Sequence, residues 1–402
     1  MNEFTVVTGV SKSHLLRTMK LLDDLNLLQI GITSFVPKKR MLIKIFPKKI
    51  RNKFISRLEN IENLPRKSHV LPETLYQIGR MLHRNGCYVI ADFVISVSFE
   101  LHSYLANRII TNTPDLRNCR LLVRAGFGSR IKKGNRFLII DASLAHPLTL
   151  PTLLMSGEFG LTSVQELSRL DKLILNDAIN ADLILVNSDF VRDSYIYAGI
   201  DAERIVVSYL PPLPIFLASP DKRIRRETGL RILFAGGLER RKGIVLIREV
   251  ADILQQAKMN FNLNLVGNWG EIDLEVKEAL LNNPHVSIQS WMPESELAAE
   301  MANADIFLFP SYAEGGARVV TEAMALGKAV ITTWNSGSPI THGYDGIISL
   351  LDSKALVNWI LKLANEPTLK SEIEVNAKQT VLTKLSDNSY VEILRELGSF
   401  SA

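Results

Sequence analysis

The chain has 402 residues, of which 47% are hydrophobic and 22% are charged, and its net charge at pH 7 is +5. These values are typical of an ordinary soluble globular protein, and no run approaches the ~18 uninterrupted apolar residues of a membrane-spanning helix. The N-terminus, MNEFTVVTG, lacks the pattern of a secretory signal. The two cysteines, Cys87 and Cys119, have neither pairing nor metal-ligand spacing. We therefore expect a cytoplasmic protein without disulfides or a structural zinc.

Apolar runs in the N-terminal half predict strands and longer helices in alternation. The predicted strands are 4–8, 88–95, 121–124, 137–140 and 183–187. The predicted helices are 11–28, 73–85 and 153–179. The half ends at LPPLP, residues 210–214. Such a cluster of prolines cannot continue a helix or a central strand, so it predicts an interdomain linker.

The second half alternates more regularly between strands and amphipathic helices. Its predicted strands are 231–235, 261–266, 285–289, 305–309, 329–333 and 346–350. Helices are predicted at 244–256, 294–302 and 317–326. This alternation is typical of an open, doubly wound parallel sheet. The predicted fold class is therefore α/β, with two doubly wound, Rossmann-like parallel-sheet domains facing each other across a cleft, where ligands of such folds bind.

The stretch from Val36 to Arg57 contains nine basic residues and no acidic one, interleaved with apolar side chains. This pattern suits an anionic membrane surface, where each basic residue contributes ~1 kcal/mol. It equally fits a solvated basic face whose apolar side lies in the core. Nucleic acid is disfavoured, because aromatic stacking residues are sparse there and no recognition motif accompanies the charge.

The sequence EGGARVVTE places Glu314 and Glu322 around the start of a predicted helix. Eight helical steps span ~12 Å, which is too far for one proton transfer or a shared metal. That distance suits the two ends of an elongated ligand. The first backbone N–H groups of the helix, at Gly316, Ala317 and Arg318, would bind a diphosphate between two sugar-binding carboxylates. Taken alone, the stretch fits two solvated acids on a surface helix better.

A second candidate loop, GGLERRKG at 236–243, follows the first predicted strand of this domain. Its glycines let the backbone approach a ligand, and Lys242 can place a charge on a phosphate. By itself such a loop is more often a solvated turn. Its occurrence in the same domain as Glu314 and Glu322 favours a phosphate site.

These motifs together resemble glycosyltransferase family 4, a family of retaining enzymes with the two-domain GT-B fold. The resemblance is dense from Arg231 to Leu350, where FAGGLERRKG is followed by PSYAEGGARVVTEAMALGKAVITT. It implies transfer of a sugar from a UDP- or GDP-sugar to an acceptor hydroxyl, in the synthesis of a cell-surface glycan or glycolipid. It implies no required metal and no cofactor, and the chain has no Asp-x-Asp motif placed to hold a metal-diphosphate complex.

The resemblance also implies roles for individual residues. Glu314 would contact the donor sugar, Glu322 the ribose and Lys242 the diphosphate. The implied donor-binding set is Lys242, Arg241, Gly236, Gly237, Trp291, Met292, Gly315, Gly316, Ala317, Arg318, Val319 and Glu322. Gly237 stands where the family commonly has a phosphate-binding arginine, which Arg240 or Arg241 would replace. Ala317 stands where the family has a second glycine.

The N-terminal half resembles the family only in outline. His146 follows a predicted strand where the family often presents a histidine to the reacting centre, so Glu314 and His146 are the candidate catalytic residues. A lone histidine is more often structural, so the resemblance leaves the catalytic and the structural interpretation of His146 equally open. Residues 8–14 take the place of the family's first glycine-rich loop, which makes Gly9 and Ser11 candidates for the acceptor side.

On this interpretation, residues 1–210 form an acceptor-binding domain and 223–385 a nucleotide-sugar-binding domain, joined by a linker at 211–222. Residues 386–402 would form a helix that crosses back to the N-terminal domain. The expected partners are a nucleoside-diphosphate sugar, a lipid-linked or glycan acceptor, and an anionic membrane surface at 36–57 on the inner face. The alternative is a non-catalytic nucleotide-sugar-binding protein or membrane-associated scaffold of the same fold. A dehydrogenase fits less well, because neither glycine loop reads GxGxxG.

Overall fold

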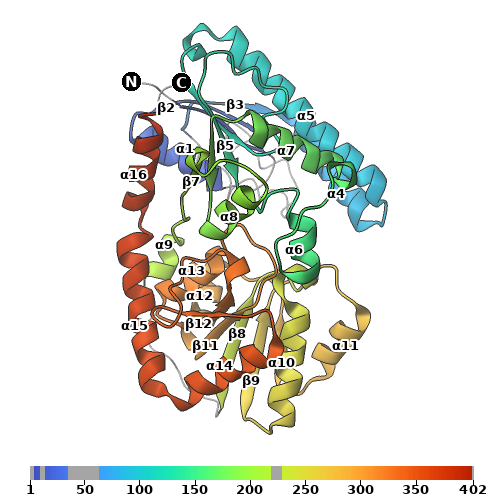
Figure 1. Ribbon diagram of the computed structural model, residues 1–402, viewed down its shortest axis with the longest axis vertical. Coiled ribbons are helices and arrows are strands. Elements are labelled where there is room, and N and C mark those ends of the chain that lie inside the picture. Colours follow the sequence, from blue (N-terminus) through green and yellow to red (C-terminus); the bar gives the residue numbers. More distant parts are fainter. Residues whose placement is uncertain (1–3, 10–13, 35–62, 219–228, 401–402) are drawn as a thin grey trace.

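The computed structural model describes residues 4–9, 14–34, 63–218 and 229–400. These residues form two α/β domains stacked along the long axis of the molecule (Figure 1). Each domain has one parallel sheet with helices on both faces, so the prediction of two doubly wound domains is confirmed. The basic stretch 36–57 and Ser11 lie outside the described residues.

The N-terminal sheet has the strand order β3-β2-β1-β4-β5-β6-β7, with all neighbours parallel. Its strands are β1 (Phe4–Val7), β2 (Leu28–Ser34), β3 (Arg66–His69), β4 (Arg120–Arg124), β5 (Leu138–Ala142), β6 (Leu183–Val186) and β7 (Ile205–Val207). The helices that follow these strands are α1 (His14–Asp24), α4 (Val70–Arg84), α5 (Tyr88–Asn112), α6 (Leu150–Ser156), α7 (Arg169–Asn180) and α8 (Asp189–Tyr197).

The C-terminal sheet has the order β10-β9-β8-β11-β12-β13 and is also parallel. Its strands are β8 (Leu230–Ala235), β9 (Phe261–Val266), β10 (Val286–Gln289), β11 (Ile306–Phe309), β12 (Ala329–Thr333) and β13 (Ile347–Ser349). The helices are α9 (Pro214–Leu217), α10 (Ile244–Gln256), α11 (Leu274–Asn282), α12 (Glu294–Asn303), α13 (Arg318–Ala325), α14 (Ser353–Asn365), α15 (Pro367–Lys384) and α16 (Asp387–Leu397).

The strand order reverses direction between β1 and β4 in one sheet and between β8 and β11 in the other. Loops at the carboxyl ends of such strands diverge and leave room for a ligand. The loops that carry Gly9, Gly236 and Glu314 follow β1, β8 and β11, respectively. The topology therefore brings both glycine-containing loops of the C-terminal domain to one switch point.

Helix α16 packs against the N-terminal domain, although it follows the last helices of the C-terminal domain (Figure 1). Its buried side chains Tyr390, Leu394 and Leu397 join the same apolar cluster as β1 and α1. The hydroxyls of Tyr390 and Thr18 lie 2.7 Å apart. Two segments, the linker and α16, thus connect the domains.

Three predicted elements of the N-terminal half are wrong. Residues 88–95 belong to α5 and not to a strand, because a short apolar run fits a buried helix as well as a buried strand. The helix predicted at 153–179 is broken into α6 and α7, with Gly157 in a left-handed conformation (φ 79°) at the end of α6. The helix predicted at 11–28 ends at Asp24, and Leu28 already begins β2.

We expect the buried Asp177 carboxyl to make stability depend on pH. Its Oδ2 accepts the N–H groups of Gly126 (2.7 Å) and Gly128 (2.9 Å), while burial raises its pKa from 3.8 to about 7. Between those two values the folded state holds a proton that the unfolded chain has released, so stability falls as pH rises through this window.

Asp177→Asn should remove the pH dependence that Asp177 causes. Between pH 5 and pH 8 the free energy of unfolding should then fall less in the variant than in wild type, by roughly 1 to 3 kcal/mol. Urea unfolding at the two pH values measures the change. Asp115→Asn, at an exposed position, is the matched control. An equal pH dependence in wild type and Asp177→Asn would contradict the assignment.

Candidate functional site

A cavity of about 450 Å³ lies at the carboxyl ends of the C-terminal strands. Most of the predicted donor-binding residues line it. They are Gly236, Gly237, Lys242, Trp291, Met292, Glu314, Gly316, Ala317, Arg318, Val319 and Glu322. Segments almost ninety positions apart in the sequence therefore share one cavity.

The loop after β8 approaches its neighbours too closely for side chains at two glycines. Gly243 has φ 81°, and a Cβ there would lie 1.9 Å from the carbonyl oxygen of Pro310, which follows β11. A Cβ at Gly267, after β9, would lie 1.7 Å from the carbonyl oxygen of Gly236. The glycines therefore allow three strand ends to converge, and Lys242 is carried into the cavity beside Gly243.

The Glu314 carboxylate is paired with two basic groups. Its Oε1 lies 2.7 Å from Arg241 Nη1 and 2.9 Å from Lys242 Nζ. Arg241 also donates to Glu239 (2.8 Å) and to the carbonyl oxygen of Ala313 (2.9 Å). Arg241 thus joins the loop after β8 to the loop after β11 and fixes Glu314. It does not line the cavity, unlike Lys242.

The start of α13 is partly occupied by protein. The N–H of Ala317 donates to the carbonyl oxygen of Ser336 at 2.9 Å. The expectation that the amides of Gly316, Ala317 and Arg318 are all available is therefore corrected for Ala317. One turn further, Glu322 is only 6% exposed, and its Oε1 lies 3.4 Å from Arg318 Nε.

The loop that carries Glu314 reaches across to the N-terminal domain. The Ser188 hydroxyl donates a hydrogen bond to the carbonyl oxygen of Gly315. A Cβ at Gly315 would lie 1.8 Å from the carbonyl oxygen of Ser143, so only glycine fits. Gly315 does not line the cavity itself, but its contacts place Glu314 at the boundary between the domains.

His146 and Gly9 are not among the residues that line this cavity. His146 is 1% exposed, and its ring packs at right angles on Tyr195, with centroids 4.8 Å apart. Burial lowers the pKa of His146 to about 4, so the ring is neutral near pH 7. Its Nδ1 accepts the N–H of Leu148. Gly9 is also buried, against the ring of Phe127. A catalytic role for His146 stays a prediction.

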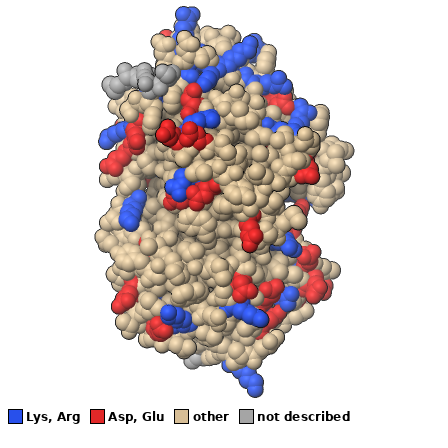
Figure 2. Space-filling view, viewed as in Figure 1, with Lys and Arg blue, Asp and Glu red and all other residues tan. Residues whose placement is uncertain are grey.

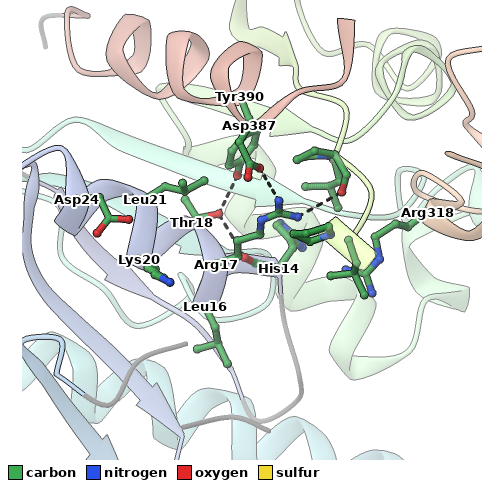
Figure 3. Close-up of a pocket in the computed structure, with 14 residues that line it drawn as sticks. His14, Leu16, Arg17, Thr18, Lys20, Leu21, Asp24, Arg318, Asp387 and Tyr390 are labelled. Atoms are coloured by element: carbon green, nitrogen blue, oxygen red, sulfur yellow. Dashed lines mark hydrogen bonds and ion pairs between the residues drawn. The ribbon is translucent and has the colours of Figure 1, made fainter. Parts of the chain in front are cut away.

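A second cavity, of about 390 Å³, lies beside the first and shares Leu213 and Arg318 with it. Figure 3 shows its lining from α1, α16, the proline linker and α13. His14 lies on its wall, with Nε2 2.8 Å from Oδ1 of the buried Asp141. Sequence reasoning gave neither residue a role, although Asp141 ends a buried strand at the ligand-binding edge of its sheet.

Arg17 in this second cavity ties the domains together. Its guanidinium donates to the carbonyl oxygens of Pro211 and Pro212, both at 3.4 Å, and to the Asp387 carboxylate (Figure 3). One side chain of α1 therefore holds both segments that pass between the domains. Among the described residues, no group of three or more His, Cys, Asp or Glu side chains could hold a metal ion.

Comparison with known proteins identifies the class. Residues 218–380 match the family model described as glycosyl transferases group 1. Among solved structures, Anabaena HepE in complex with UDP and glucose superposes on this chain with a TM-score of 0.67 at 16% identity. The superposition covers 100% of each chain. Sucrose-phosphate synthase from Thermosynechococcus elongatus gives 0.65 at 15% identity, over 99% of this chain and 98% of that one. These superpositions show the two-domain GT-B fold.

Sequence relatives agree with this class. An uncharacterized glycosyltransferase, MJ1178 of Methanocaldococcus jannaschii, is 24% identical over 70% of this chain and 82% of its own length. The amylovoran biosynthesis glycosyltransferase AmsK of Erwinia amylovora is 27% identical over 54% of this chain. The match spans only 56% of the length of that relative. Residues 218–380, which make up most of the C-terminal domain, are therefore similar to the group 1 glycosyltransferases.

Lys242→Ala should weaken the binding of UDP or GDP by roughly fivefold or more, because a charge-assisted contact to phosphate is lost. Isothermal titration with each nucleotide measures the loss. Lys258→Ala is the control, since this exposed lysine lies outside the cavity. Equal affinities for wild type and Lys242→Ala would remove the residue from the phosphate site.

Arg241→Ala should affect turnover more than nucleotide affinity, because Arg241 positions Glu314 from outside the cavity. We expect kcat for donor hydrolysis or transfer to fall by roughly tenfold or more, with a nucleotide Kd within about twofold of wild type. Arg241→Lys should recover part of kcat. A large loss of nucleotide affinity would instead make Arg241 a direct phosphate ligand.

Proposed function

We propose that the protein is a retaining glycosyltransferase that moves a sugar from a UDP- or GDP-sugar to an acceptor hydroxyl. The observation that carries this proposal is that one cavity, at the carboxyl ends of the C-terminal strands, holds Lys242, Glu314 and Glu322. A basic group and two carboxylates in one cavity are the groups that a diphosphate and two sugars would need. This combination supports a nucleotide-sugar as the ligand.

Each of these residues has a task in the proposed reaction. The diphosphate gains negative charge as its bond to the sugar breaks, and Lys242 and the start of α13 would stabilise that charge. Glu314, held by Arg241, would accept hydrogen bonds from the donor-sugar hydroxyls. Glu322 would accept those of the ribose. We propose that the chain requires no metal for this step, because the positive charge comes from its own residues.

The acceptor would lie on the N-terminal side of the cleft. The loop after β6 already reaches the boundary through Ser188, beside Gly315. Relatives include a Staphylococcus aureus capsular polysaccharide enzyme and a Campylobacter jejuni enzyme named for a diphospho-undecaprenol acceptor. These names support a cell-surface glycan or a lipid-linked saccharide as acceptor, modified on the cytoplasmic side of the membrane.

A non-catalytic nucleotide-sugar-binding protein of the same fold is the second candidate. It is favoured by Gly237, which supplies no charge where the related enzymes commonly have arginine. The engagement of Arg241 with Glu239 and Glu314 also favours it, since that guanidinium is not directed at the cavity.

Glu314→Ala separates the two candidates. We expect wild type to hydrolyse one or more nucleotide-sugars of a UDP and GDP panel, and Glu314→Ala to lose roughly a hundredfold or more in kcat at unchanged thermal stability. Glu278→Ala, an exposed acid on α11, is the matched control and should retain activity. Binding of a nucleotide-sugar without turnover by wild type, with or without candidate acceptors, would favour the non-catalytic protein.

A further inference from the structure

The hairpin of α4 and α5 exposes an unusual number of large apolar side chains. The two helices are joined by a short turn at 85–87, and the turn end projects from the side of the N-terminal domain (Figure 1). The exposed apolar residues are Val70, Leu71, Ile78, Met81, Tyr88, Val89, Ile90 and Phe93. Val89, in the first turn of α5, is 85% exposed. We call the part from Ile78 to Phe93 the hairpin tip.

The rest of the hairpin is part of the core, so the tip is held rigidly. A Cβ at Gly79 would lie 2.6 Å from Cγ1 of Ile95, which shows how closely the helices cross. Further along α5, Phe99 stacks on Phe127 with centroids 4.1 Å apart, and Ala106 and Ile110 are fully buried. The hairpin tip lies beyond these contacts, and its two helices are already formed there.

Within the described residues, α5 is long and apolar enough to cross a bilayer, and 33% of its most apolar window is buried in the protein. Core helices of soluble proteins pass the same test. Insertion across a membrane would withdraw Phe99 and Ala106 from the core beside the N-terminal sheet. Packing therefore opposes spanning, but leaves the tip free for a shallow contact.

The fully exposed charges at the tip are basic. Arg80 and Arg84 are exposed on α4. The guanidinium of Arg169 lies 5.2 Å from the ring centroid of Phe93 and is paired with Glu100, so Arg80 and Arg84 carry the charge of this surface. Of the nearby acids, Glu73 is buried and Asp92 half-buried. In Figure 2 the protrusion formed by the hairpin shows a largely uncharged surface. An apolar hairpin tip that carries basic side chains suits an anionic lipid surface.

We propose that the hairpin tip docks the N-terminal domain on an anionic lipid bilayer. The side chains of Met81, Val89 and Ile90 would enter the boundary between headgroups and acyl chains, with Tyr88 at headgroup depth. Arg80 and Arg84 would contact the lipid phosphates. This surface is distinct from the donor cavity, and the proposal holds whether or not the protein transfers sugars.

Vesicle flotation tests the apolar part. Wild-type protein should float with phosphatidylglycerol-containing vesicles, and Val89→Ser/Ile90→Ser should lower the apparent affinity by about tenfold. Both residues are exposed, so thermal stability should not change. Val375→Ser/Leu382→Ser, on the exposed face of α15 in the C-terminal domain, is the matched control. Unchanged flotation of the hairpin variant would overturn the proposal.

The basic part is tested with the same vesicles. Arg80→Gln/Arg84→Gln should lower affinity for anionic vesicles by about tenfold at low salt and weaken the preference over phosphatidylcholine. A second copy of the chain is the competing occupant of the tip. If light scattering showed a wild-type dimer that Val89→Ser/Ile90→Ser converts to a monomer, with no vesicle binding by wild type, the tip would be a dimer interface and the proposal would be overturned.

Discussion

The site depends on the pairing of Glu314 with Arg241 and Lys242. The three residues come from two loops that follow neighbouring strands, β8 and β11, and their contacts fix the distance between those loops. These two ion pairs hold the carboxylate in one place, which a sugar-binding group requires. Because Gly315 is wedged against Ser143, the same loop also sets how the domains meet at this point. Donor recognition and domain contact thus share one loop.

The fold of the C-terminal domain could be predicted closely because strands such as β8, β11 and β12 are short apolar runs between clear breaks. The predicted strand 329–333 coincides with β12, and the predicted helix 244–256 coincides with α10. In the N-terminal half, the apolar runs at 121–124 and 183–187 gave strands correctly, as β4 and β6. The run at 88–95 did not, because its first residues continue as the 25-residue helix α5, and the apolar run alone does not distinguish a strand from a helix. Strands β2 and β3 were not predicted, and β3 has a polar sequence, RKSH.

The candidate site divides in the same way. Lys242, Glu314 and Glu322 were predicted because they stand in contiguous motifs whose local backbone brings them to the cavity. The partner of the Ala317 amide, Ser336, and the pair of His14 with Asp141 come from distant segments. Their contacts form only when the sheets and loops assemble, so the spacing of residues within one short segment does not predict them. The burial of His146 is another long-range property, since its position in a motif does not reveal that its ring packs on Tyr195.

Two kinds of contact link the domains, and they differ in strength. On the cleft side, hydrogen bonds join the domains, such as those from the Ser188 hydroxyl to Gly315 and from the Asn335 amide to the carbonyl oxygen of Gly157. On the opposite side α16 buries Tyr390, Leu394 and Leu397 in the N-terminal core. An apolar contact of this size costs several kcal/mol to separate, whereas one hydrogen bond contributes about 1 kcal/mol. Relative motion of the domains should therefore open the cleft at Gly315 and pivot about α16 and the linker, where Arg17 holds both segments.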